Sequence, residues 1–120
     1  MGHLVSYKAL EFAVRAVRLN KFLCEEKQEF VMSRQLLRSA TSIGANLSEA
    51  EYAQSTNDFI NKNSIALKEA AESDYWLELL YKTDFLTKKQ YESLNKDCEE
   101  LIKMLTSIIK TTKSNNRKPY

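Results

Sequence analysis

The scarcity of glycine and proline is the feature that most limits what this chain can fold into. Its 120 residues include only Gly2, Gly44 and Pro119. Turns between β-strands rely on Gly, Pro, Asn and Asp, so an interior almost free of glycine and proline can hardly supply the turns of a sandwich or a barrel. A chain of this length also forms one domain rather than two. We therefore expect a single all-α domain.

Apolar side chains recur at alternating spacings of three and four residues in four segments of the chain. This spacing keeps them on one face of an α-helix. In chain order the four series are Val5, Ala9, Phe12, Ala16, Leu19 and Leu23; Leu36, Ala40, Ile43, Leu47 and Ala50; Phe59, Ala66, Ala70, Leu77 and Leu80, with Asn63 and Ser73 at the two remaining steps; and Tyr91, Leu94, Cys98, Leu101, Leu105 and Ile108.

Capping residues and the ends of these series indicate the helix boundaries. Thr87 with Gln90 forms a capping box, and Ser55 with Asp58 makes a weaker version of the same arrangement. We predict helices over residues 4–27, 31–53, 56–83 and 88–113 in one domain spanning 1–113, followed by a frayed polar tail over 114–120. Connections of only a few residues force neighbouring helices to run antiparallel, so the expected architecture is an antiparallel up-down-up-down four-helix bundle.

The residue types that carry most enzyme chemistry are scarce. The only histidine is His3, so a Ser or Cys nucleophile lacks its usual base and a di-iron site lacks its ligands. Cys24 and Cys98 stand alone, without the paired spacing of a zinc site, and fit apolar helix faces as reduced thiols. We therefore predict no enzyme activity, no metal and no cofactor. Carboxylates such as Glu49 and Glu72 are the only remaining acid–base groups.

The composition is that of a globular chain, with 43% hydrophobic and 28% charged residues. No apolar run approaches the ~20 residues that cross a bilayer, and the sequence shows no secretory leader. We expect a cytoplasmic protein that makes no membrane contact.

The helix predicted over 31–53 carries a second stripe of mostly small, polar side chains. These are Gln35, Ser39, Ser42, Asn46, Glu49 and Ala53. Because a solvated helix face normally carries long charged side chains, this stripe favours a close helix approach with hydrogen bonds across it. We predict a partly buried polar layer that consists of Arg38, Ser42, Asn46, Glu49 and Glu72, with Gly44 allowing a near backbone contact. The alternative is a neutral, exposed stripe.

The helix predicted over 56–83 has more apolar surface than one face can hold. Consecutive helical residues point about 100° apart, so Trp76 and Leu79 diverge from the stripe of Leu77 and Leu80. We predict that Tyr75, Trp76 and Leu79 form a contact between copies of the chain, since large aromatic side chains anchor interfaces. The alternative is extra coverage within one chain.

Charge is unevenly distributed along the chain. Residues 1–38 carry seven basic and four acidic side chains, residues 39–84 three and eight, and residues 85–120 eight and four. The last helix has a basic residue at every seventh position. We predict a solvated face in which Glu92 pairs with Lys96 and Glu99 with Lys103. The alternative is a line that follows nucleic-acid phosphates, with Lys103, Lys110, Lys113, Arg117 and Lys118 as the candidate contacts.

The stretch from Ser33 to Glu49 resembles the signature of small bacterial four-helix-bundle proteins encoded within 23S rRNA intervening sequences. The similarity continues almost to the end of the chain. The residues that carry it are Gln35, Arg38, Ala40, Ser42, Ile43, Asn46 and Glu49, then Asp58-Phe59-Ile60, Ile65-Ala66-Leu67, Glu72, Leu77, Glu78 and Phe85-Leu86-Thr87.

This resemblance implies a bacterial, cytoplasmic four-helix bundle that forms a homopentameric ring, and it implies no activity. A related branch, the accessory proteins of diversity-generating retroelements, forms a basic pentamer that binds nucleic acid and a reverse transcriptase. We therefore predict a non-catalytic scaffold whose partner is a further copy of itself and, beyond that, an unidentified protein. The alternative is an RNA- or DNA-binding module that uses the basic faces of the helices over 4–27 and 88–113.

Overall fold

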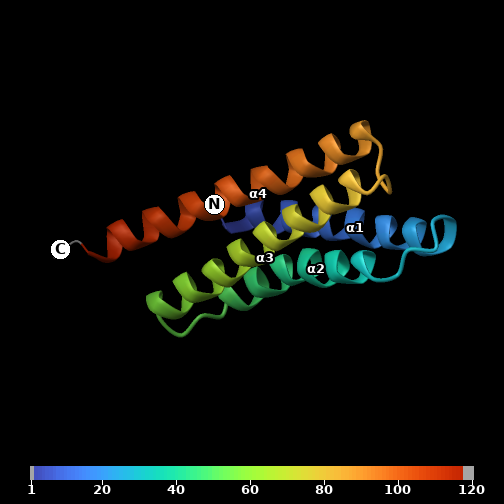
Figure 1. The fold of residues 1–120 in the computed structure, drawn as a ribbon. Helices are drawn as coiled ribbons and strands as arrows, with labels where there is room; N and C mark the ends of the chain where they lie inside the picture. Colours follow the sequence, from blue (N-terminus) through green and yellow to red (C-terminus); the bar gives the residue numbers. More distant parts are fainter. Residues whose placement is uncertain (1, 118–120) are drawn as a thin grey trace.

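The computed structural model describes residues 2–117 of the chain. They form four helices, α1 (Gly2–Glu26), α2 (Met32–Ala50), α3 (Thr56–Lys82) and α4 (Lys88–Asn116), and this part of the chain contains no strand. Each helix runs in the direction opposite to the one before it, as the colour gradient in Figure 1 shows. The prediction of an all-α four-helix bundle is confirmed.

α1 and α3 each end one residue before the predicted end, whereas α2 and α4 each differ from it by three residues. α2 ends at Ala50, three residues before the predicted end, and a turn follows it. α4 continues to Asn116, because its backbone hydrogen bonds run three residues beyond the predicted end. The prediction of a frayed tail from residue 114 is therefore wrong for residues 114–116, and residues 118–120 lie outside the described part of the chain.

The predicted capping residues begin α3 and α4. Thr87 and Gln90 exchange the two hydrogen bonds of a capping box: the Gln90 N–H donates to Oγ1 of Thr87 at 3.2 Å, and the Thr87 N–H donates to Oε1 of Gln90 at 2.9 Å. At α3, Oγ of Ser55 accepts from the N–H of Asp58, but the Asp58 carboxylate accepts from Gln54 instead of reaching back to Ser55. The short aspartate side chain thus makes a modified capping box.

α2 begins in a way that the sequence pattern does not indicate. Its N-cap residue, Val31, has no side-chain hydrogen bond to offer. The carboxylate of Glu29 takes this role and accepts hydrogen bonds from the N–H groups of Val31, Met32 and Ser33 at 3.1, 3.1 and 2.7 Å. These are N–H groups that the first turn of a helix leaves without a partner. The hydroxyl of Ser33 donates back to the Glu29 carbonyl at 2.9 Å, which closes the turn.

The core contains almost all of the side chains in the four apolar series. All of the series on α2 is buried, and Val5, Ala9, Phe12, Ala16 and Leu23 of α1 join it. The series on α3 and α4 are buried apart from their first aromatic residues, Phe59 and Tyr91, which are half-buried and pack on the core. A stacked pair of rings, Tyr81 and Tyr91, joins α3 to α4 with 4.7 Å between ring centroids.

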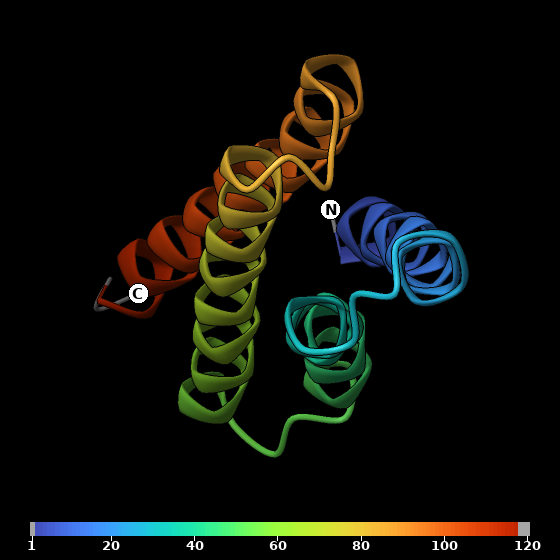
Figure 2. The same cartoon turned by 45° about the vertical axis from the view of Figure 1, so that its right-hand side comes forward.

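The helices pack in chain order into an elongated body of 56 × 23 × 20 Å. α1 packs along α2, α2 along α3 and α3 along α4, whereas contacts between α1 and α4 are the sparsest. Figure 2 shows why: α4 slants across α3 and leads away from α1. The bundle is therefore loosest along the junction of its first and last helices. No helix within residues 2–117 has both the length and the apolar character that a membrane span needs.

Candidate interaction surfaces

An arginine-centred cluster joins α2 to α3 at the edge of the bundle. The guanidinium of Arg38 pairs with the carboxylates of Glu69, at 3.3 Å, and Glu72. The indole N–H of Trp76 donates to the same Glu72 oxygen at 3.0 Å. About half of the Arg38 side chain is exposed, so these pairs contribute little to stability and mainly fix the positions of the side chains.

The structure brings together part of the predicted polar layer. Arg38 pairs with Glu72 of α3, and Glu49 pairs with Lys62 of α3 at 3.0 Å. Arg38 and Glu49 are exposed rather than partly buried, because each pairs at the rim of the junction. Ser42 and Asn46 instead donate to carbonyl groups of α2 itself, at 2.7 and 2.8 Å. The layer is therefore a row of separate contacts along the α2/α3 junction rather than one connected network.

The most deeply buried polar contact between the two helices was not predicted from the sequence. Ser39 and Ser73 are fully buried, and their hydroxyl oxygens lie 2.9 Å apart across the α2/α3 junction. One hydroxyl donates to the other, and the accepting hydroxyl donates to a carbonyl of its own helix, that of Leu36 for Ser39 or of Glu69 for Ser73. A serine on each of two adjoining core faces is the signal that could have identified this pair.

The three α3 residues that were predicted to contact another copy, Tyr75, Trp76 and Leu79, differ in their exposure to solvent. Trp76 is half-buried and packs on the core, with its ring edge-on to that of Tyr75 at 5.0 Å between centroids. Tyr75 is exposed and Leu79 is half-buried. The indole is thus held by its own chain, and Tyr75 is the member of this group that is most available to a partner.

The basic residues that are candidate contacts for nucleic acid lie on the exposed side of α4. Lys103, Lys110, Lys113 and Arg117 are exposed, and Lys118 lies outside the described residues. The two ion pairs predicted for the solvated face do not form: Glu92 pairs with Lys88 at 3.7 Å instead of Lys96, and Glu99 does not pair with Lys103. Within residues 2–117 none of these four cations has a carboxylate within 4.0 Å.

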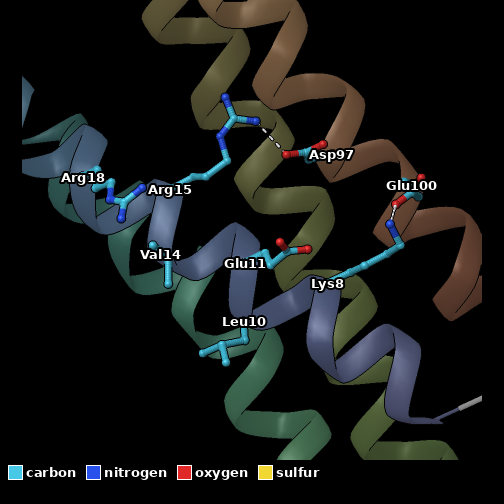
Figure 3. A pocket seen from close by; sticks show the side chains of 8 residues that line it. All are labelled: Lys8, Leu10, Glu11, Val14, Arg15, Arg18, Asp97 and Glu100. Atoms are coloured by element: carbon cyan, nitrogen blue, oxygen red, sulfur yellow. Dashed lines mark hydrogen bonds and ion pairs between the residues drawn. The ribbon is translucent and has the colours of Figure 1, made fainter.

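A cavity of 440 Å³ opens where α1 and α4 diverge. Lys8 and Arg15 reach across it from α1 to Glu100 and Asp97 of α4, each pair at 2.6 Å (Figure 3). Arg15 also donates to the hydroxyl of Ser93 at 2.9 Å. Long charged side chains therefore bridge the two helices here in place of close packing, and the hydrogen bond to Glu100 raises the pKa of Lys8.

An apolar stripe on the outside of α1 was not predicted from the sequence. Five exposed side chains follow one another three or four residues apart, and we call them the α1 stripe: Leu4, Tyr7, Leu10, Val14 and Val17. Most of the stripe lies on the side of α1 opposite Phe12 and the core. The spacing itself was the available signal, because a helix with two apolar series has a second face to cover.

A groove of 310 Å³ adjoins the α1 stripe between α1 and α2. Its walls consist mostly of small side chains. We call it the α1/α2 groove, and it is lined by Ser6, Leu10, Ala13, Thr41, Gly44, Ala45, Ser48 and Glu51. Leu10 therefore belongs to both surfaces.

The two cysteines differ in burial, and this predicts different reactivity. Cys98 is fully buried, its thiol donates to the Ala70 carbonyl at 3.2 Å, and burial together with Asp74 raises its pKa to about 12. Cys24 is half-buried. Because the thiolate is the reactive form, Cys24 alone should react with a thiol reagent in the folded protein, and both should react in denaturant. A Cys24→Ser variant that still reacts when folded would contradict this.

Asp74 faces α4 in a partly buried site. Burial raises the pKa of this carboxyl above 3.8, and the hydrogen bond from Asn95 opposes the shift. The folded state thus holds the proton more tightly than the unfolded state, and this contribution to stability is lost as the pH rises through the folded pKa. Asp74→Asn should raise the melting temperature at pH 7, and the gain should shrink at pH values below 3.8. A lower melting temperature of the variant at pH 7 would refute this.

Within residues 2–117 no three His, Cys, Asp or Glu side chains gather closely enough to hold a metal ion.

Known proteins similar to this chain share its fold. A family model described as the 23S rRNA-intervening sequence protein matches residues 3–107. A crystal structure of a protein of unknown function, from the S23 ribosomal protein family of Bacteroides thetaiotaomicron VPI-5482, is 62% identical with a TM-score of 0.90, and the match covers 91% of this chain and 97% of that one. No curated protein matches the chain. This chain therefore belongs to the 23S rRNA-intervening sequence protein family.

Proposed function

We propose that this protein is a non-catalytic scaffold that associates with copies of itself. The observation that carries the proposal is the α1 stripe, in which five large apolar side chains lie on the outside of the bundle. Large contiguous apolar patches on a soluble protein mark contact sites. A further copy of the chain is the partner that is present wherever the protein is made.

The family resemblance supports the same proposal, since it implies a homopentameric ring in the bacterial cytoplasm. We propose that number of copies and that location for this chain. The scaffold would then present its other exposed surfaces, including Tyr75 and the lysines of α4, several times in one assembly. Such repetition raises the strength of any weak contact with a further partner.

Light scattering after size exclusion tests the proposal. The wild-type protein should have the mass of several 13.9-kDa chains, and five if the ring of the family is retained. Because the contact is mainly apolar, the mass should be the same at low and moderate salt. The mass of a single chain at every concentration in a dilution series would overturn the proposal.

A second candidate function is the binding of RNA or DNA, which the lysines of α4 favour. Lys96, Lys103 and Lys110 repeat every seven residues, about 10.5 Å apart on one side of the helix. All three are exposed, and within the described residues none is neutralised by a carboxylate. A ring would multiply this charge and bring several such lines together.

This candidate predicts binding that weakens steeply as salt rises. Replacing Lys103, Lys110 and Lys113 with Gln should weaken the binding of a labelled structured RNA and lower the salt slope by about one for each phosphate that the variant no longer neutralises. Lys62→Gln with Lys82→Gln is the matched control, because both lysines pair with carboxylates. Equal losses of affinity in the two variants, or binding that does not depend on salt, would eliminate nucleic acid as the ligand of α4.

A further inference from the structure

The α1 stripe and the α1/α2 groove lie next to each other on the bundle and share Leu10. The stripe is a ridge of large apolar side chains, and the groove is a channel with mostly small side chains along its walls. We propose that the stripe of one copy seats in the α1/α2 groove of the next copy. This inference rests on the proposed self-association and names the surfaces that it uses.

The area of a stable interface favours a contact that includes the groove. Such an interface buries about 800 Å² on each partner, and even a whole aromatic side chain supplies only about 150–250 Å². The five side chains of the stripe are each only about half exposed, so the stripe alone falls short. A row of side chains that enters a groove is buried on its flanks as well as at its tips, so a contact with the groove of the next copy buries more area on both partners than a flat contact would.

Charges at the ends of the two surfaces are complementary. Lys21 follows Val17 by four residues and continues the line of the stripe, and Arg18 lies beside it. Glu51 lines the groove. All three side chains are exposed, and none has an ion-pair partner within residues 2–117. Opposite charges on the ridge and on the groove favour a second copy of this chain as the occupant.

The groove also offers a role for the one glycine inside a helix. A Cβ atom at Gly44 would lie 3.8 Å from Cβ of Ala9, which is an ordinary contact, so the packing of α1 on α2 does not require glycine. Glycine in a helix interior costs about 1 kcal/mol relative to alanine. Gly44 also lines the groove together with Leu10 and Ala13, where a methyl group would take up space. Gly44→Ala should therefore raise the melting temperature of the single chain and weaken its association.

A contact of this kind joins two different surfaces of the same chain. When the stripe and the groove of one copy engage two different neighbours, successive copies add head to tail. Such heterologous contacts produce a ring when the rotation between copies closes. A stripe that met a second stripe would instead give a two-fold dimer.

Two variants, each with one damaged surface, test this arrangement. Tyr7→Asp with Val17→Asp damages the stripe, and Ala45→Arg with Ser48→Arg fills the groove; all four positions are exposed. Each variant alone should run at the mass of one chain. Mixed in equal amounts, they should form a complex of two chains, because one intact stripe then meets one intact groove. Association in the mixture also shows that both variants are folded.

Tyr75→Asp is the matched control, because Tyr75 is 58% exposed on α3 and Tyr7 is 59% exposed on α1. It should keep the wild-type mass. An assembly that persists in the stripe or the groove variant, or that only Tyr75→Asp dissociates, would overturn the inference while leaving self-association intact. A wild-type protein that is itself a single chain would refute self-association and this inference together.

Discussion

Replacing Phe12 with Ala should lower the free energy of unfolding by about 3–5 kcal/mol. Phe12 is 2% exposed and is among the largest fully enclosed side chains of the core, where α1 packs on the rest of the bundle. Removing its ring deletes apolar contacts and leaves a cavity that the surrounding helices only partly close. Denaturant unfolding, followed by helical circular dichroism at matched protein concentrations, measures the change.

Phe12→Leu is the control for this experiment. It retains most of the apolar volume, so it should cost less than half as much as Phe12→Ala. Equal losses of stability in the two variants would mean that the ring is not enclosed as the structure shows. A loss below about 1 kcal/mol for Phe12→Ala would place the core of the bundle on another face of α1.

Replacing Glu29 with Ala should lower the free energy of unfolding by about 2 kcal/mol, because hydrogen bonds to a charged group contribute about 1.5–3 kcal/mol. The Glu29 side chain is almost fully enclosed and accepts from the three N–H groups of Val31, Met32 and Ser33. Without it, these groups lose their partner at the start of α2. The same denaturant measurement reports the change.

Glu26→Ala separates this capping effect from the loss of a negative charge. Glu26 is exposed and ends α1, where a carboxylate faces the negative end of the helix dipole. Its removal should therefore leave the stability unchanged or slightly raise it. If Glu26→Ala and Glu29→Ala destabilised the protein equally, the effect would belong to charge in general and the capping role would be wrong.

The fold could be predicted from the sequence because one physical signal, the spacing of the apolar side chains, determines most of it. Side chains three and four residues apart share a helix face, and the four series that follow this rule form nearly the whole core. Thr87 and Gln90 mark the start of α4 through chemistry that is local in the sequence. Short connections then leave few ways to arrange four helices.

Sequence reasoning missed two kinds of feature. Some depend on contacts that form only when the chain folds, and the other is a second apolar series on a helix whose first apolar series forms the core. Glu29 precedes α2 by three residues, and it follows a turn in which Gln28 adopts a left-handed backbone conformation with φ of 56°. The hydroxyls of Ser39 and Ser73 meet only when α2 and α3 pack. The α1 stripe alternates with the core series of the same helix, so a search for a single apolar face overlooks it.

The candidate surfaces were harder to predict than the fold because a side chain can contact a partner only if it is exposed to solvent. Trp76 diverges from the core series in sequence, yet its indole packs on the core and donates to Glu72. Tyr7 and Leu10 attract less attention in the sequence, and they are more exposed than most apolar residues of the bundle. A sequence pattern shows that a side chain leaves the main apolar face, and the packing of the neighbouring helix determines whether it reaches solvent.

Native mass spectrometry of the wild-type protein beside its Tyr7→Asp, Val17→Asp variant tests the central proposal most directly. The wild type should appear as one assembly of several 13.9-kDa chains, and the variant as a single chain with an unchanged helical spectrum. A wild type that appears only as a single chain, over the same range of concentrations, would contradict the proposal that this bundle is a self-associating scaffold.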